Sequence, residues 1–256
     1  MNTAKNINSL ESFVCRIIKR MTLELVISDL DGTILETEDY HRLAYNHLFK
    51  ELSLEVSWSK QDYINRLNVM GGGKLREVFS WLNKQENQYE KFRYEAYEKK
   101  TQLYLDLITK DLRNGSLELR TGVARLFEEI QASCIPLAIG TACEKKAAFT
   151  VLEAALGPDF CSNLATLCGG DDVLKKKPDP AIYLLVAQRC QVDPSNCLVL
   201  EDTRHGMEAA LAAGMKCIVT PSEYAKEHDF NGATLHAIDL ETPCRIGLKE
   251  LLCLFT

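Results

Sequence analysis

The sequence predicts an α/β protein in which a parallel sheet, covered by helices on both faces, carries an inserted α-helical cap domain. Short apolar runs rich in β-branched residues alternate with helical segments through the second half of the chain, and this alternation is typical of parallel sheets. One further run of this kind stands near residue 25, and helical periodicity alone follows it up to about residue 111. We therefore expect the helical domain to be inserted directly after the first strand.

The first strand is predicted at residues 23–28, where the sequence reads LELVIS. Asp29 and Asp31 follow it in the segment DLDGT, and an extended backbone would point both side chains toward the same side. Two adjacent carboxylates repel each other, whereas a magnesium ion would relieve the repulsion and attract the oxygens of a phosphate. Because Asp and Gly are also favoured in turns, an ordinary turn remains the alternative interpretation.

The region after the first strand is predicted to be helical. Apolar residues recur at helical spacing between Glu38 and Asp111 and predict four helices, with a break at the MGGG segment. The turn-rich sequence RNGS then leads back into the alternating part of the chain. The predicted divisions are an N-terminal extension (1–20), an α/β core domain (21–35 and 116–256) and a helical cap domain (36–115).

Further strands are predicted in the core at PLAIG near residue 138, CLVL near 199, KCIVT near 218 and, with the weakest pattern, ATLHAI near 235. The helices between them are predicted at 121–133, 144–156, 181–190 and 206–213. Ligands of parallel sheets bind at the carboxyl ends of the strands. Polar residues that follow the strands are therefore the candidates for chemistry.

Three groups of polar residues stand at such positions. Thr141 follows PLAIG where a helix is expected to begin, which suits either a phosphate site or a plain helix N-cap. Lys177 ends the lysines of DDVLKKKPDP and could neutralise a carboxylate and a phosphate, whereas a solvated charge run is the alternative. Glu201 and Asp202 directly follow CLVL and could either complete the oxygen ligands of magnesium or cap the next helix.

These pieces, in this order, resemble the haloacid dehalogenase superfamily: DLDGT, a hydroxyl after the second strand, a lysine and an acidic pair. The resemblance extends from residue 22 to about residue 222. It implies a Rossmann-like parallel sheet core with an inserted helical cap, and a phosphatase whose catalysis rests on positioning and charge neutralisation of a phosphoryl group.

The same resemblance implies roles for individual residues. Asp29 would attack phosphorus to form an aspartyl phosphate, and Asp31 would protonate the leaving oxygen and then activate water. The Thr141 hydroxyl, the backbone N–H of Ala142 and the Lys177 ammonium would hold the phosphoryl oxygens.

A Mg²⁺ cofactor is also implied by the resemblance. Its expected ligands are the Asp29 carboxylate, the Asp31 backbone carbonyl and Asp202, with Glu201 assisting.

Within the superfamily, the segment DGTILETEDYHRLAYNHLF resembles the branch of β-phosphoglucomutase and the CbbY-type xylulose-1,5-bisphosphate phosphatases. The resemblance places His41 near the reacting centre when the cap closes, although a histidine on a helix can also be purely structural. The segment GGGK resembles a CbbY-type cap loop, so Gly72, Gly73 and Lys74 are expected to bind substrate. A helix-joining loop that ends in a surface lysine is the alternative.

Three functions follow from these observations. The leading hypothesis is a magnesium-dependent phosphatase of a small phosphorylated sugar, with xylulose-1,5-bisphosphate as a candidate. A sugar-phosphate mutase of the same fold is the alternative. A non-catalytic binding protein of that fold is the third hypothesis, which the presence of both aspartates, the lysine and the acidic pair disfavours.

Composition and charge limit the partners. The net charge of −6 disfavours nucleic acid, and no apolar stretch approaches the roughly 18 residues of a membrane span. Nine of the ten cysteines lie beyond residue 130 without a Cys-x-x-Cys pair, which favours reduced thiols. We therefore expect a cytoplasmic monomer, with the plastid as the alternative location.

Overall fold

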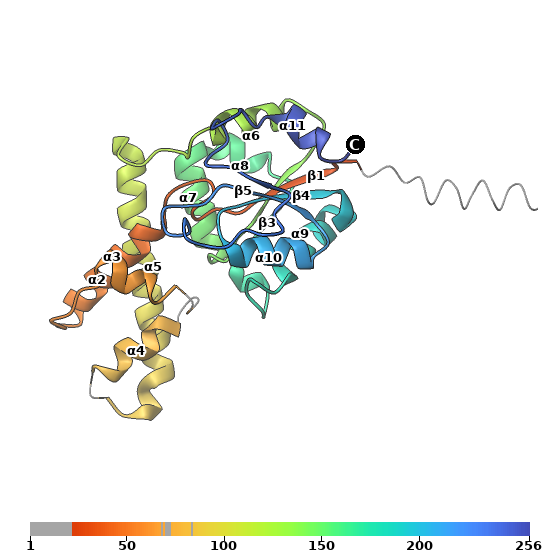
Figure 1. The fold of residues 1–256 in the computed structure, drawn as a ribbon. Coiled ribbons are helices and arrows are strands. Elements are labelled where there is room, and N and C mark those ends of the chain that lie inside the picture. The colour runs from red at the N-terminus through yellow and green to blue at the C-terminus, as the bar shows by residue number, and fades with distance from the viewer. Residues whose placement is uncertain (1–21, 68, 70–72, 83) are drawn as a thin grey trace, which may run out of the picture.

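A computed structural model describes residues 22–67, 69, 73–82 and 84–256 of the protein. The predicted extension at 1–20 and the candidate substrate residue Gly72 lie outside the described residues. The described chain forms a lobe built on a parallel sheet and a second lobe of helices beside it (Figure 1).

The sheet has six strands in the order β3-β2-β1-β4-β5-β6, and every neighbouring pair is parallel. This is the strand order of a Rossmann-type sheet, so the predicted α/β class is confirmed. The strands are β1 (Leu25–Ser28), β2 (Leu137–Gly140), β3 (Leu167–Cys168), β4 (Cys197–Glu201), β5 (Lys216–Val219) and β6 (Leu235–His236). The chain order reverses between β1 and β4, and ligands of such sheets bind at this switch point.

Helices cover both faces of the sheet. Figure 1 shows α6 (Val123–Gln131) and α11 (Leu248–Cys253) on one side, with α9 (Ala181–Cys190) and α10 (Arg204–Ala212) on the other. Neighbouring residues of β1 enter different clusters, because Val26 packs toward α6 and Ile27 toward α9. Both faces of β1 are therefore buried, as its continuous apolar sequence predicts.

The predicted strands are all present, and the strand β3 is an addition. The two remaining helices of this lobe are α7 (Lys145–Leu156), which was predicted, and α8 (Pro158–Ser162), which was not. The nine cysteines of the described residues are free thiols. No helix in this part of the chain is long and apolar enough to cross a membrane.

The second lobe, called the helical lobe below, consists of α2 (Glu38–Glu51), α3 (Lys60–Ile64), α4 (Lys74–Ser80) and α5 (Tyr89–Asn114). The predicted four helices are present in its described residues. They pack around a separate aromatic cluster that includes Phe49 and Trp58. Tyr104 and Ile108 of α5 instead join the core of the sheet lobe, so the base of the helical lobe is packed firmly against it.

Candidate active site

The site begins at the carboxyl end of β1. Asp29 follows the strand directly, is 5% exposed and still bonds to the sheet, since its backbone N–H donates to the carbonyl of Leu200 at 3.0 Å. The loop then turns at Gly32, whose φ of +83° suits glycine. A Cβ atom at Gly32 would lie 2.2 Å from Oδ2 of Asp202, so glycine also allows the ends of β1 and β4 to approach.

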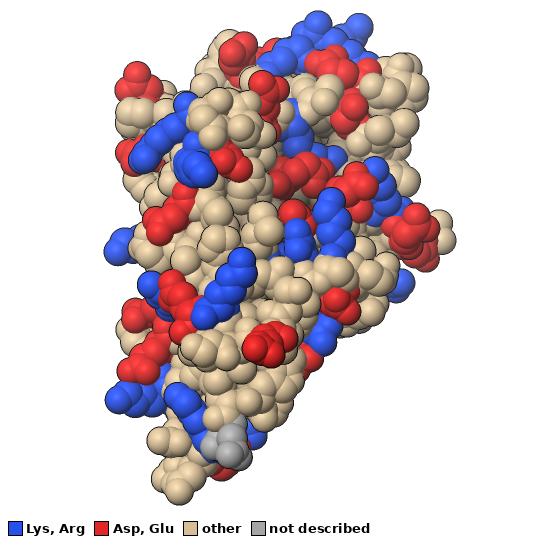
Figure 2. All heavy atoms as spheres, turned by 90° about the vertical axis from the view of Figure 1, so that its left-hand side faces the viewer, with Lys and Arg blue, Asp and Glu red and all other residues tan. Residues whose placement is uncertain are grey.

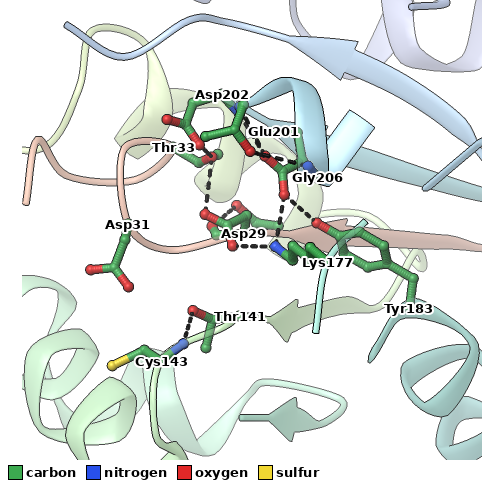
Figure 3. Close-up of polar contacts among 12 residues, drawn as sticks. Asp29, Asp31, Thr33, Thr141, Cys143, Lys177, Tyr183, Glu201, Asp202 and Gly206 are labelled. Atoms are coloured by element: carbon green, nitrogen blue, oxygen red, sulfur yellow. Dashed lines mark hydrogen bonds and ion pairs between the residues drawn. The ribbon is translucent and has the colours of Figure 1, made fainter. Parts of the chain in front are cut away.

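Lys177 places a cation beside Asp29 and Glu201. It is 7% exposed, and its Nζ lies 2.5 Å from Oδ1 of Asp29 and 2.7 Å from Oε1 of Glu201 (Figure 3). Burial disfavours the ammonium, but the two carboxylates outweigh that effect and raise the Lys177 pKa above its ordinary value. The alternative of a solvated charge run is therefore wrong for this lysine.

Glu201 ends β4 and has both carboxylate oxygens occupied. Oε1 accepts from Lys177 and, at 2.6 Å, from the hydroxyl of Tyr183. Oε2 accepts from the backbone N–H groups of Asp202 (2.9 Å) and Thr203 (3.1 Å). Helix α10 is capped by the Thr203 side chain, which accepts from the N–H of Gly206, so the acidic pair is not that helix's N-cap.

Three buried carboxylates meet at this point. Asp29, Glu201 and Asp202 each offer an oxygen, and these oxygens lie within 4.8 Å of one another. Burial raises the Asp29 pKa to about 8 although Lys177 opposes it, and burial with the neighbouring Glu201 and Asp29 raises the Asp202 pKa well above its ordinary value. One lysine does not balance three carboxylates, so a hard divalent cation with oxygen ligands fits this donor set.

Thr141 follows β2 on the opposite side of the cavity. It is 1% exposed, and its hydroxyl accepts from the N–H of Cys143 at 3.0 Å (Figure 3). Helix α7 begins only at Lys145 with Glu144 at its N-cap position, so the plain N-cap interpretation of Thr141 is wrong. Thr141 and Ala142 both line the cavity.

The side chain of Asp31 points away from Lys177 and toward the helical lobe (Figure 3). Its Oδ1 accepts from the hydroxyls of Thr37 (2.6 Å) and Tyr104 (2.8 Å). Nε2 of His41 lies 3.9 Å from the same oxygen, and the His41 ring stacks on Tyr104 with centroids 4.0 Å apart. The general-acid candidate is thus held by residues of the helical lobe and its entry.

His41 also contacts Lys100 of α5, whose Nζ lies 2.6 Å from Nδ1 of the imidazole. Burial lowers the Lys100 pKa to about 8. Burial, together with Lys100 and Lys74, holds the His41 pKa well below its ordinary value, so this imidazole is neutral. The structure therefore places His41 in the cavity wall as part of a polar network.

Lys74 is the first residue of α4 and follows Gly73. It is 7% exposed, its Nζ donates to the carbonyl of Val69 at 2.7 Å and lies 5.1 Å from the ring centroid of Tyr63. Burial lowers its pKa. The alternative of a surface lysine is wrong, because Lys74 lines the cavity.

These side chains surround one cavity of about 200 Å³ between the two lobes. The predicted residues that line it are Asp29, Asp31, His41, Lys74, Thr141, Ala142, Lys177, Glu201 and Asp202. The sequence reasoning missed Lys100 and Tyr104, which also line the cavity, and Tyr183, which donates to Glu201. On the face of the molecule shown in Figure 2, acidic and basic side chains are interspersed rather than gathered by sign.

The family model of the haloacid dehalogenase-like hydrolases matches residues 26–220 of the sequence. This range includes the ends of β1 and β4 with their acidic residues, and Lys177. The chain belongs to this family. It is accordingly a phosphatase of the haloacid dehalogenase type.

Similar proteins carry the CbbY name. The chain is 34% identical to Protein CbbY of Rhodobacter capsulatus over 231 residues, which covers 90% of this chain and 100% of that protein. It is 38% identical to the CBBY-like protein of Arabidopsis thaliana over 218 residues, which covers 81% of this chain and 66% of that protein. A crystal structure of CbbY from Rhodobacter sphaeroides in complex with xylulose-(1,5)bisphosphate has a TM-score of 0.78 and 28% identity, covering 90% of this chain and 99% of that one.

Proposed function

We propose that the protein is a magnesium-dependent phosphatase of small phosphorylated sugars that acts through an aspartyl phosphate on Asp29. The observation that carries the proposal is the buried contact of Lys177 with Asp29 and Glu201, beside Asp202, at the ends of β1 and β4. A nucleophilic carboxylate beside a fixed ammonium suits attack on an anionic phosphoryl group, which must be neutralised before it can be approached.

In the first step, a carboxylate oxygen of Asp29 forms a bond to phosphorus while the bond from phosphorus to the sugar oxygen breaks. Asp31 gives its proton to the departing sugar oxygen. Lys177 and Thr141 hold the phosphoryl oxygens from two sides of the cavity. In the second step, Asp31 takes a proton from water, the water oxygen bonds to phosphorus, and the Asp29 carboxylate is released with inorganic phosphate.

The donor set supports particular ligands for Mg²⁺. Asp29, Asp202 and the Asp31 carbonyl would hold the ion, which supplies positive charge to the phosphoryl oxygens. Glu201 already accepts hydrogen bonds on both oxygens, so its main role is to fix Lys177 and the start of α10.

We further propose that the helical lobe, with boundaries at residues 36 and 115, acts as a cap that selects the substrate. It contributes His41, Lys74 and Lys100 to a cavity of about 200 Å³, which suits a small polar molecule with more than one anionic group. The Rhodobacter sphaeroides CbbY structure contains xylulose-(1,5)bisphosphate, so a pentulose bisphosphate is the first substrate to try.

Phosphate release from a panel of sugar mono- and bisphosphates, with and without Mg²⁺, tests the proposal. We expect Mg²⁺-dependent release from a pentulose bisphosphate, and none by the Asp29→Asn variant. Interconversion of sugar-phosphate isomers without net release would show a mutase instead. Full activity of Asp29→Asn would show that the nucleophile is another residue.

A further inference from the structure

The loop after β5, residues 220–228, runs from the sheet lobe to the helical lobe. Its Tyr224 hydroxyl donates a hydrogen bond to the carboxylate of Asp39 on α2. The Tyr224 ring meets the Tyr63 ring of α3 edge-on, with centroids 6.1 Å apart and planes at 90°. Tyr63 and Tyr224 both line the catalytic cavity, so this contact closes part of the cavity wall.

On the side of the helical lobe, Asp39 is held in position by Arg42. Asp39 accepts two hydrogen bonds from Arg42, from Nε at 2.8 Å and from Nη2 at 3.0 Å. Nη1 of Arg42 donates to the carbonyl of Trp58 at 2.9 Å, and Trp58 belongs to the aromatic cluster of this lobe. Asp39 is therefore fixed within the helical lobe.

On the sheet side, the loop is tied to the nucleophile loop through Arg120. Arg120 donates to the carbonyls of Thr220 and Pro221, each at 2.7 Å, and also to the carbonyl of Gly32. Gly32 belongs to the DLDGT turn that carries both catalytic aspartates. The position of Tyr224 is thus fixed relative to the reacting centre.

The hydroxyl of Tyr224 is suited to hold these two units together. Burial and the hydrogen bond to Asp39 raise the Tyr224 pKa above its ordinary value, so the phenol stays protonated and remains a donor. The cavity lies between the lobes, and a sugar phosphate enters more easily when they separate. Because Tyr224 and Asp39 belong to different lobes, their hydrogen bond favours the arrangement in which the lobes meet.

We propose that Tyr224 is a positioning and specificity-determining residue that clasps the helical lobe to the sheet lobe around the substrate. This inference rests on the proposed function, because the clasp affects the hydrolysis of phosphate esters that contact the helical lobe. A sugar phosphate has a poor leaving group, so its hydrolysis needs the proton of Asp31. The Asp31 side chain is held by Thr37 and Tyr104. Hydrolysis of p-nitrophenyl phosphate has a good leaving group and needs little help from that lobe.

The first test compares Tyr224→Phe with the parent on two substrates. Tyr224→Phe keeps the ring in the cavity wall and removes only the hydroxyl. We expect kcat/KM for the best sugar phosphate to fall about 10-fold, because a hydrogen bond to a charged group is lost. We expect kcat/KM for p-nitrophenyl phosphate to change less than about threefold. Equal losses on both substrates, or no loss on either, would overturn the proposal.

A matched control removes a similar bond within the helical lobe. The Tyr40 hydroxyl donates to Asp111 at 2.9 Å, and both residues belong to that lobe. Tyr40→Phe should leave the ratio of the two kcat/KM values unchanged.

Asp39→Asn should lower that ratio as Tyr224→Phe does, and the double variant should be no worse than either single variant. Additive losses would show that the two residues act separately.

A measurement without substrate separates the clasp from the proposed function. Hydrogen exchange of the parent and of Tyr224→Phe should differ in residues 36–42 and 220–228, with faster exchange in the variant. Unchanged exchange there would overturn the clasp whatever the substrate is. If exchange rises but no sugar phosphate is hydrolysed by the parent, the clasp stands and the proposed function fails.

Discussion

Replacing Gly206 with alanine is expected to disrupt the lysine site and to destabilise the protein. A Cβ atom at this position would lie 1.7 Å from Oε1 and 2.2 Å from Oε2 of Glu201, so the carboxylate would have to move. Glu201 is 1% exposed, and both of its carboxylate oxygens accept hydrogen bonds from Lys177, Tyr183 and the backbone of the following residues. A displaced carboxylate would therefore lose these buried hydrogen bonds.

Two opposing effects set the magnitude. Alanine is more favourable than glycine in a helix by up to about 1 kcal/mol, and Gly206 lies in the first turn of α10. Disrupting a buried ion pair costs about 3–5 kcal/mol, because it leaves a buried charge without its partner. We therefore expect the free energy of unfolding to fall by about 2–4 kcal/mol, with phosphatase activity reduced about 100-fold through the displaced Lys177.

Urea unfolding in a double-mutant cycle with Glu201→Ala is the assay. Without the Glu201 carboxylate there is no clash, so Gly206→Ala should be neutral or stabilising by up to about 1 kcal/mol in that background. The destabilisation by Gly206→Ala should therefore disappear or reverse in the Glu201→Ala background. An equal loss of stability in both backgrounds would refute the reasoning, because the cost would then come from the backbone and not from Glu201.

Three other predictions concern the same network. Tyr183→Phe removes one donor to Oε1 of Glu201 and should lower the free energy of unfolding by about 1–2 kcal/mol. Tyr94 is 64% exposed, so Tyr94→Phe should leave the free energy of unfolding unchanged, and equal effects of the two variants would contradict this prediction. Lys100→Met should raise the His41 pKa in an NMR titration, because a neighbouring positive charge is removed. The control Lys99→Met, at the adjacent position, should leave the His41 pKa unchanged. Asp202→Asn should raise the Mg²⁺ concentration for half-maximal activity at least about 10-fold, and an unchanged requirement would exclude Asp202 as a ligand.

The sheet lobe was largely predictable because its signals are local. Asp29 and Glu201 directly follow apolar runs, and parallel strands bring their carboxyl ends to one edge, so spacing along the chain translates into proximity. Strands β3 and β6 both have two residues, and of these only β6, within the run ATLHAI, was predicted. The helix predicted at 144–156 is α7, which begins at Lys145, and Thr141 precedes it and lines the cavity.

The helical lobe was less predictable because its contacts depend on helix rotation and packing. Lys100 and Tyr104 are four residues apart on α5 and face the cavity together, but in the sequence they stand among other polar and aromatic residues of a 26-residue helix. The segment GGGK suggested a lysine presented by a loop, whereas Lys74 is buried against Tyr63. Only tertiary packing distinguishes these arrangements.

The two aspartates with proposed catalytic roles are held by different parts of the molecule. Asp29 is fixed by Lys177 within the sheet lobe, whereas the Asp31 side chain is held by Thr37 and by Tyr104 of the helical lobe. In the proposed mechanism, attack on phosphorus therefore depends mainly on the sheet lobe, and protonation of the leaving oxygen depends on the position of the helical lobe. Substitutions in the helical lobe should accordingly act most strongly on substrates whose leaving groups need a proton, and this couples substrate selection to acid catalysis.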